Sequence, residues 1–176
     1  NKVFIARSID GYISDAKGGL DWLQSVPNPE ASDLGYLAFM KEIDALVMGR
    51  NTFQVVCGFD IDWPYDKPVF VLSRSMKEIP SEYRGKAELF SGEPEAVLQH
   101  IHGLGYGRLY IDGGKTIQSF LAADLIDEMI ISTLPVLLGG GSPLFDWLPS
   151  PLDFELKHLR VLLDAIVQDH YSRKRR

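Results

Sequence analysis

Hydrophobic positions along the chain follow two alternating patterns. Short continuous apolar runs predict buried strands. The expected strands are 2–8, 45–48, 67–72, 87–90, 108–111 and 126–134, followed by a closing pair at 154–162 and 165–172. Apolar residues at i, i+4 and i+7 predict helices between them, at about 31–43, 51–56, 94–104 and 116–125. This alternation predicts an α/β fold with a mostly parallel sheet, to which the closing pair adds antiparallel C-terminal edge strands.

One long segment between these elements has neither pattern. Residues 14–30 are rich in Gly, Pro, Asp and Ser and predict a loop. A loop of that length in a small domain usually has a function. Because the chain has 176 residues and no repeat or linker, residues 1–176 are expected to form one domain.

Charge and cysteine content exclude several classes of function. The formal net charge is −6 although Arg173 to Arg176 are all cationic, so the rest of the chain is strongly acidic, which argues against nucleic-acid binding. The basic end is either a nucleic-acid arm or, as we expect, a solvated terminus. Cys57 is the only cysteine, which excludes an internal disulfide and suits a reducing cytoplasm. Neither a signal peptide nor an apolar run long enough for a membrane span is recognisable, and the histidines lack zinc-ligand spacing, so we expect no membrane partner and no metal.

Polar segments follow three of the predicted strands. In parallel α/β sheets, ligands bind beyond the carboxyl ends of the strands. The segments at those ends are Gly49-Arg50-Asn51-Thr52, Ser73-Arg74-Ser75 and Asp112-Gly113-Gly114-Lys115-Thr116. Glycines before a helix let backbone N–H groups approach a phosphate, and the hydroxyl and guanidinium groups suit a phosphate monoester. Each segment alone is a common turn, but together they indicate a phosphorylated dinucleotide.

Longer matches carry a family resemblance. They are Ala6-Arg7-Ser8-Ile9-Asp10-Gly11-Tyr12-Ile13, Leu46-Val47-Met48-Gly49-Arg50-Asn51-Thr52-Phe53, Val71-Leu72-Ser73-Arg74, Asp112-Gly113-Gly114, Leu125-Ile126-Asp127-Glu128 and Pro135-Val136-Leu137-Leu138-Gly139-Gly140-Gly141-Ser142-Pro143-Leu144-Phe145. On these segments the chain resembles the dihydrofolate reductase superfamily. Within it, the chain is similar to stand-alone relatives of the C-terminal reductase domain of bacterial riboflavin-biosynthesis deaminase/reductase enzymes. The resemblance implies a dihydrofolate-reductase-like three-layer fold.

The resemblance also implies a cofactor, NADPH, and roles for the strand-end segments. The segment that begins at Gly49 matches the pyrophosphate and adenosine-phosphate contact, and Ser73 and Arg74 match positions that face the ribose 2′-phosphate. Gly113 and Gly114 match the pair at the nicotinamide end, where the superfamily suggests a cis peptide. The loop 14–28, with Trp22, resembles the mobile loop that covers the nicotinamide.

The substrate stays open because the chain departs from the riboflavin enzymes. Tyr12 and Asp112 stand where those enzymes have Lys and Glu, and their Ser- and Arg-rich loop for the substrate phosphate is not recognisable. The first hypothesis is a 5-amino-6-(5-phosphoribosylamino)uracil reductase-like enzyme acting on a small heterocycle. The second is a dihydrofolate reductase, and the third is an NADPH-binding module without turnover.

Candidates for chemistry are few. Asp33 lies 16 residues before Gly49, about where dihydrofolate reductases have the carboxylate that grips the pterin ring, but it is also a typical helix-start acid. Asp112 is either a second acid or a turn residue. The aromatic candidates for a flat heterocycle pocket are Trp22, Phe53 and Trp63. The apolar segment 135–151 either folds onto its own sheet or, as we favour, packs on a second subunit in a homodimer.

Overall fold

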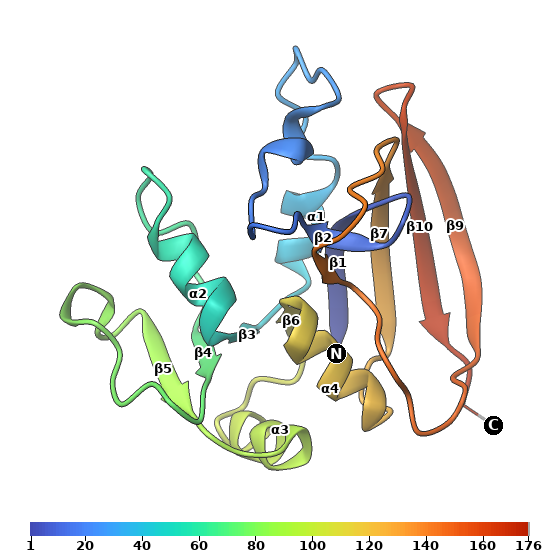
Figure 1. Cartoon of the computed structure of the whole chain (residues 1–176). Helices are drawn as coiled ribbons and strands as arrows, with labels where there is room; N and C mark the ends of the chain where they lie inside the picture. Colours follow the sequence, from blue (N-terminus) through green and yellow to red (C-terminus); the bar gives the residue numbers. More distant parts are fainter. Residues whose placement is uncertain (176) are drawn as a thin grey trace.

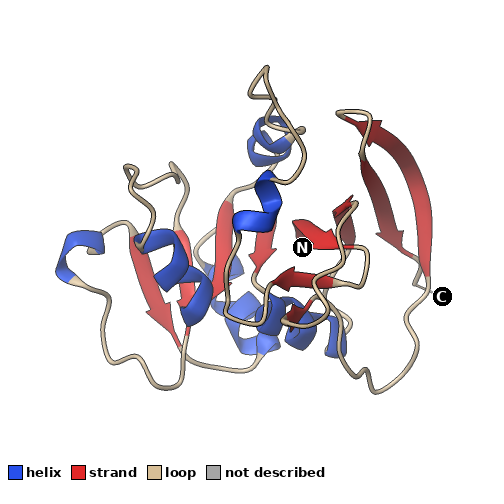
Figure 2. Ribbon diagram, turned by 45° about the horizontal axis from the view of Figure 1, so that its top comes forward, coloured by secondary structure: helices blue, strands red, loops and turns tan. Residues whose placement is uncertain are grey.

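A twisted sheet of eight strands forms the centre of the computed structural model, which describes residues 1–175 (Figures 1 and 2). The strand order is β5-β4-β3-β6-β1-β7-β10-β9. Neighbouring strands from β5 to β7 are parallel, and β10 is antiparallel to both β7 and β9. The strands are β1 (Lys2–Ser8), β3 (Ala45–Gly49), β4 (Val69–Leu72), β5 (Ala87–Phe90), β6 (Leu109–Asp112), β7 (Glu128–Leu134), β9 (Phe154–Leu162) and β10 (Ile166–Arg173). The predicted parallel sheet with antiparallel C-terminal edge strands is confirmed.

Helices cover both faces of this sheet and make three layers. On one face, α3 (Pro94–Gly103) and α4 (Gly114–Ala122) pack on a core that includes Val97, Ile117 and Phe120. On the other face, α1 (Tyr36–Lys41) and α2 (Arg50–Cys57) contribute Phe39 and Phe53 to a second core. The short elements are η1 (Asp21–Gln24), η2 (Ser81–Tyr83) and a two-stranded sheet of β2 (Tyr12–Ser14) and β8 (Ser142–Pro143). No helix in residues 1–175 is long and apolar enough to cross a membrane.

The helix predicted at 31–43 is much shorter in the structure. Only Tyr36–Lys41 is α-helical, because the chain turns sharply before it. Asn28 closes a turn by exchanging two hydrogen bonds with the backbone of Ser32. Leu34 and Gly35 then have φ values of 55° and 94°, which a right-handed helix does not allow. The apolar residues of this segment therefore form a helix of six residues only.

The turn between β6 and α4 differs from the expectation in its peptide geometry. Residues 1–175 contain no cis peptide bond, so the expectation of one between Gly113 and Gly114 is wrong. The turn is made by Gly113 instead, whose φ of 88° is open to glycine but strained for other residues. As a result α4 begins at Gly114, two residues earlier than predicted.

The basic end is solvated in part: Lys174 and Arg175 are exposed, whereas Arg173 is partly buried. The Arg173 guanidinium donates to the Asp124 carboxylate at 2.7 Å, and Arg175 donates to Asp127 at 2.6 Å. The Arg173 side chain is only 10% exposed. Arg176 lies outside the described residues. The end of β10 is therefore held by ion pairs to the segment that precedes β7.

Candidate active site

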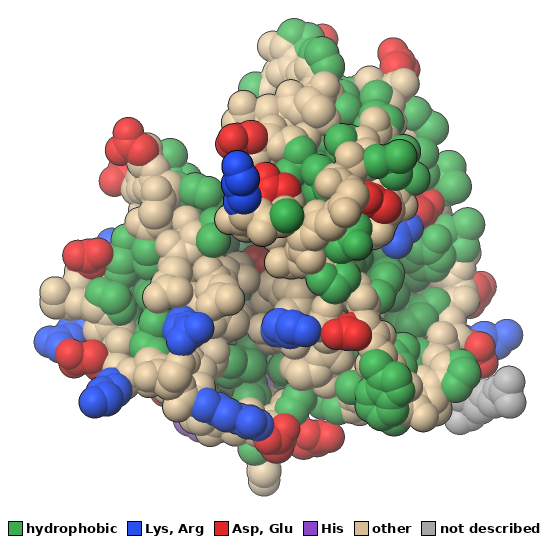
Figure 3. Space-filling model, in the orientation of Figure 1, with side chains coloured by type: hydrophobic (Ala, Val, Ile, Leu, Met, Phe, Trp, Pro, Cys, Tyr) green, Lys and Arg blue, Asp and Glu red, His purple; other side chains and the backbone are tan. Residues whose placement is uncertain are grey.

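The three polar segments meet at one edge of the sheet because their strands are neighbours. β4, β3 and β6 are consecutive and parallel, so their carboxyl ends lie side by side. A pocket of about 1440 Å³ opens there, and it forms the hollow in the centre of Figure 3. Its lining includes every residue predicted to bind the cofactor: Gly49, Arg50, Asn51, Thr52, Ser73, Arg74, Ser75, Gly113, Gly114, Lys115 and Thr116.

Two helix N-termini open onto this pocket. Gly49 precedes α2 and Gly113 precedes α4, and neither helix has a side-chain cap or an acidic residue in its first turn. The first N–H groups of each helix are therefore left for another acceptor. A helix N-terminus with free N–H groups and a positive dipole end is a favourable site for a phosphate.

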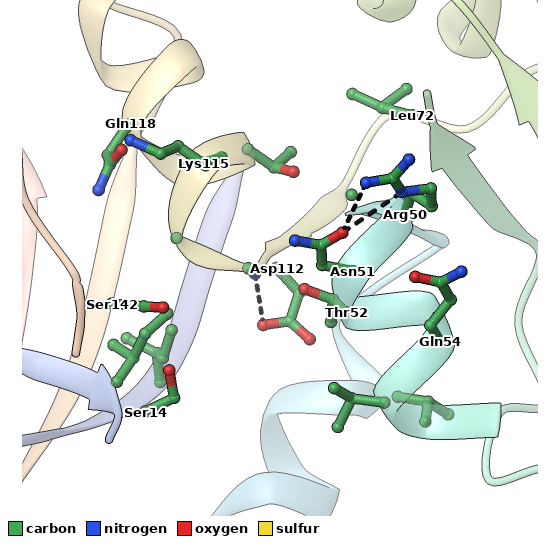
Figure 4. A pocket seen from close by; sticks show the side chains of 18 of the residues that line it. Ser14, Arg50, Asn51, Thr52, Gln54, Leu72, Asp112, Lys115, Gln118 and Ser142 are labelled. Carbon is green, nitrogen blue, oxygen red and sulfur yellow. Dashed lines mark hydrogen bonds between the residues drawn. The ribbon is translucent and has the colours of Figure 1, made fainter. Parts of the chain in front are cut away.

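The two helix starts approach each other closely, and the glycines make this approach possible. A Cβ atom on Gly113 would lie 2.2 Å from Thr52 Oγ1, and one on Gly49 would lie 3.0 Å from Thr116 Oγ1. Figure 4 shows the result: Arg50, Asn51 and Thr52 lead along the start of α2 towards Asp112, opposite the start of α4. The side chains of Thr52 and Thr116 therefore lie against glycine backbone where the two helices begin.

Arg50, Ser73, Arg74 and Ser75 form what we call the cationic end of the pocket. The Arg50 Nη1 donates to Ser75 Oγ at 2.6 Å, and Ser73 Oγ accepts the backbone N–H of Met76 at 2.9 Å. Blue side chains gather along the rim of the hollow in Figure 3. This end can accept a doubly charged phosphate through guanidinium and hydroxyl donors.

Glu93, which precedes α3, also lines the pocket and forms an ion pair with Arg74. Both side chains are more than 70% exposed, so the pair is weak and exchanges readily for another anion. A phosphate bound at the cationic end has to compete with this carboxylate.

The Asp112 carboxyl lies at the end of the strand β6, two residues before the start of α4. Its Oδ1 accepts the N–H of Gly113 at 2.8 Å, as expected of a turn residue. The carboxyl also lines the pocket, and burial raises its pKa to about 6 against the opposing effects of Gly113 and Tyr110. Asp112 is thus the acid of this site that holds a proton closest to neutral pH.

Tyr36, Tyr65 and Tyr110 form what we call the tyrosine wall. They line the pocket from α1, from the loop before β4 and from β6. Tyr110 donates its hydroxyl hydrogen to the Phe4 carbonyl at 2.9 Å. Burial and the Asp112 charge raise the pKa of Tyr36 to about 12, and the same two causes raise the pKa of Tyr65. All three phenols are therefore neutral donors close to the Asp112 carboxyl.

The loop predicted to cover the site contributes through residues other than the tryptophan. Lys17, Gly18, Leu20 and Leu23 line the pocket. Trp22 is buried in a separate apolar cluster with Val26, Leu134 and Ile166. Leu20 and Leu23, on either side of Trp22, thus line the pocket, while the indole is buried in the other cluster.

The structure also places other candidates outside the pocket. The Asp33 carboxylate accepts the N–H groups of Gly35 and Leu37 at the start of α1 and is not part of the pocket lining, so the geometry favours the helix-start interpretation. Phe53 is buried in the core, and Trp63 packs on it with ring centroids 6.0 Å apart. The aromatic lining comes from Phe4, Phe59 and the tyrosine wall instead. Among residues 1–175, no three His, Cys, Asp or Glu side chains are grouped as metal ligands.

Sequence comparison identifies relatives along the whole chain. The profile of the RibD C-terminal domain matches residues 2–167. The uncharacterized protein YwjB of Bacillus subtilis (strain 168) is 33% identical over 97% of this chain and 96% of its own length. A 2,5-diamino-6-ribosylamino-4(3H)-pyrimidinone 5′-phosphate reductase of Methanothermobacter thermautotrophicus is 27% identical over 77% of each chain.

Solved structures show the same fold. A protein from Shewanella sp. PV-4, assigned provisionally to riboflavin biosynthesis, superposes with a TM-score of 0.97 at 54% identity over 99% of both chains. Dihydrofolate reductase from Enterococcus faecalis, in complex with NADP(H), superposes with a TM-score of 0.69 at 17% identity, over 99% of this chain and 96% of that one. The three-layer fold is therefore dihydrofolate-reductase-like, and the chain belongs to the RibD C-terminal domain family.

Proposed function

We propose that this chain is an NADPH-dependent reductase of the riboflavin-biosynthesis type that transfers a hydride to a small heterocyclic substrate. One observation carries the proposal. A cationic end, two uncapped helix N-termini and a buried carboxyl with a raised pKa follow one another along a single pocket. That sequence of groups matches, in order, a ribose phosphate, a pyrophosphate and a reacting ring.

The residues present fit such a cofactor. The cationic end would hold the ribose 2′-phosphate, and the starts of α2 and α4 would hold the pyrophosphate. The close approach at Gly113 and Thr52 leaves no room for a Cβ atom, so backbone N–H groups of the turn reach the ligand. NADPH, when bound, supplies the hydride.

The protein then has to orient the acceptor, exclude water and provide a proton. Leu20 and Leu23 cover the pocket from the loop, and Phe4 lies in its lining. Asp112 would give a proton to the substrate atom next to the carbon that accepts the hydride. A carbon–nitrogen double bond would thereby become a carbon–nitrogen single bond with one new C–H and one new N–H.

The cofactor assignment is tested at the cationic end. Arg74→Ala is expected to weaken NADPH binding by about 10- to 100-fold and to leave NADH binding nearly unchanged, since a charge-assisted hydrogen bond contributes about 1.5–3 kcal/mol. Isothermal titration calorimetry with both cofactors measures the two affinities.

Glu93→Gln is the matched control for this experiment. It removes the anion that competes for Arg74, so NADPH should bind up to about fivefold more tightly, as expected for an exposed pair. Equal affinity of the unaltered protein for NADPH and NADH would rule out the proposed role of the cationic end. Tight NADPH binding without turnover on any heterocycle would favour a cofactor-binding module.

We also propose that the chain forms a homodimer. Leu144 is fully buried, so part of the segment 135–151 folds onto its own sheet, but Trp147 is 75% exposed. On the edge strand β9, Leu159 and Val161 are 57% and 60% exposed. Apolar side chains that alternate along an uncovered strand are typical of an interface.

Light scattering at micromolar concentration should give twice the chain mass. The double variant Leu159→Lys/Val161→Lys should give the mass of one chain, because two buried charges would oppose the contact. A single-chain mass for the unaltered protein would refute the homodimer.

A further inference from the structure

The two ends of the pocket differ in charge. Its lining contains four cationic side chains, Lys17, Arg50, Arg74 and Lys115. Two of them belong to the cationic end, and Lys115 lies in the first turn of α4, where it reaches Asp146 at 3.4 Å. These three surround the part of the pocket assigned to the cofactor phosphates. Lys17 is the cation that remains for a substrate.

Lys17 is a weak anchor for a substrate phosphate. It lies on the exposed turn that Asp15 organises by accepting the N–H groups of Lys17 and Gly19 at 2.7 and 2.8 Å. The backbone N–H groups of Gly19 and Lys17, and to a smaller extent the Lys17 charge, lower the pKa of the Asp15 carboxyl. A phosphate near Lys17 would also meet the Asp15 carboxylate.

The end of the pocket around Asp112, which we call the substrate end, is negatively charged rather than positively charged. Asp112 is its acid, and the negative charge of Asp66 also reaches Tyr36. Burial strengthens the electrostatic interaction between Asp112 and any charge placed beside it. A phosphate or carboxylate held here would therefore be repelled, whereas neutral rings that carry N–H groups would be favoured.

The tyrosine wall offers unused polar groups beside this carboxyl. Within residues 1–175, the hydroxyls of Tyr36 and Tyr65 make no hydrogen bond to the protein, although both side chains are partly buried. Neither hydroxyl oxygen is sealed from solvent, so each is open to a ligand in the pocket. Both side chains line the pocket, which makes a bound ligand the natural partner.

We propose that the substrate of this reductase is an unphosphorylated planar heterocycle whose polar edge hydrogen-bonds to Asp112 and to the hydroxyls of Tyr36 and Tyr65. The inference rests on the function proposed above and specifies its substrate class. The edge presents N–H groups to the Asp112 carboxyl and ring nitrogen or carbonyl acceptors to the phenols. The apolar side chains of Phe4 and Leu23 contact the faces of the ring.

Matched ligand pairs that differ only in phosphate test this assignment. The first pair is 6-hydroxymethyl-7,8-dihydropterin and its pyrophosphate ester, and the second is 5-amino-6-ribosylaminouracil and its 5′-phosphate. Binding to the whole chain saturated with NADP⁺ is measured by calorimetry, after NADP⁺ binding itself has been measured separately. The unphosphorylated member of at least one pair is expected to bind at least tenfold more tightly than its phosphorylated partner.

Tyr36→Phe and Tyr65→Phe each remove one hydroxyl and should each weaken the preferred ligand by about 3- to 20-fold. NADP⁺ affinity should not change, which separates loss of a ligand contact from loss of folding. Tyr83→Phe is the control variant, because the Tyr83 hydroxyl donates to the Cys57 carbonyl and Tyr83 is not in the pocket lining. It should leave ligand affinity unchanged.

Two results would overturn the inference while leaving the cofactor assignment in place. One is tighter binding of the phosphorylated member in both pairs, with the preference lost in Lys17→Gln. The other is NADP⁺ binding without binding of either unphosphorylated heterocycle. Failure to bind NADP⁺ or NADPH would instead contradict the reductase function itself.

Discussion

Asp112→Asn is expected to lower kcat by about 10²- to 10⁴-fold, the range associated with loss of a positioned general acid. Asparagine keeps the side-chain oxygen that accepts the Gly113 N–H, so the turn into α4 should persist. What is lost is the proton. Stopped-flow measurement of NADPH oxidation, with the substrate that the unaltered protein turns over fastest, gives the rate.

The same carboxyl predicts a pH dependence. Because burial raises the Asp112 pKa to about 6, the protonated form that donates disappears above that pH. The rate of the reductive step should fall about tenfold per pH unit above about pH 6 in the unaltered protein. The residual rate of Asp112→Asn should not show this fall.

Asp112→Asn, which should lower activity, should raise the stability of the folded protein. The folded-state pKa lies above the unfolded value of 3.8, so the folded protein binds a proton more tightly and ionisation of Asp112 destabilises it. This cost is absent below pH 4, grows up to about pH 6 and is fully present above it. Asp112→Asn removes it and should raise the free energy of unfolding at pH 7.5 by at most about 3 kcal/mol, with no gain at pH 4.

Asp33→Asn is the matched control. The Asp33 carboxylate accepts the N–H groups of Gly35 and Leu37 at the start of α1, and asparagine is about as good a helix cap. Its kcat should match that of the unaltered protein. Loss of activity in Asp33→Asn with retention in Asp112→Asn would reverse the assignment of the acid.

Gly113→Ala is expected to abolish measurable cofactor binding, with an affinity loss of at least about 100-fold, while the protein still folds. Gly113 has a φ of 88° and a ψ of 136°, a combination outside the left-handed helical region that residues with a Cβ atom hardly adopt, and the Cβ of alanine would lie 2.2 Å from Thr52 Oγ1. Thr52 is branched at Cβ and held in α2, so its hydroxyl has few other rotamers. The two helix starts must then move apart, and the phosphate site between them opens.

Gly85→Ala separates backbone strain from this clash. Gly85 has a φ of 80° but no atom within 4 Å of its Cβ position. Thermal denaturation of Gly85→Ala should show a free energy of unfolding lower by about 1–2 kcal/mol, with NADPH affinity unchanged. If Gly113→Ala bound NADPH as well as Gly85→Ala does, the starts of α2 and α4 would not form the pyrophosphate site.

The half of the pocket proposed to hold the cofactor could be predicted from sequence because its residues are local to strand ends. Arg50, Ser73 and Gly113 each follow a recognisable apolar run, and the parallel order of the strands brings them together. Placing each of these residues requires only a correct prediction of where its own strand ends. Errors in the lengths of neighbouring helices leave that inference intact.

The substrate half could not be predicted in this way. The distance along the chain points to Asp33, but the left-handed turn at Leu34 and Gly35 directs its carboxylate to the start of α1. Tyr65 lies in the loop before β4, where no periodicity indicates which side chains turn inward. Asp112 did carry a signal: it is two residues after Tyr110 on one strand, so both share a face of the sheet.

The placement of Asp112 on β6 has a consequence for how new specificities could arise in this scaffold. β6 lies between β3 and β1 near the middle of the sheet, where backbone opening is rarest. Lys17 and Tyr65, by contrast, belong to connecting segments, which tolerate insertions and exchanges of sequence. The proposed acid is fixed to a central strand, whereas Tyr65, one of the proposed recognition groups, is carried by a loop. Loop exchange between paralogues should therefore alter which ring is accepted without rebuilding the proton donor.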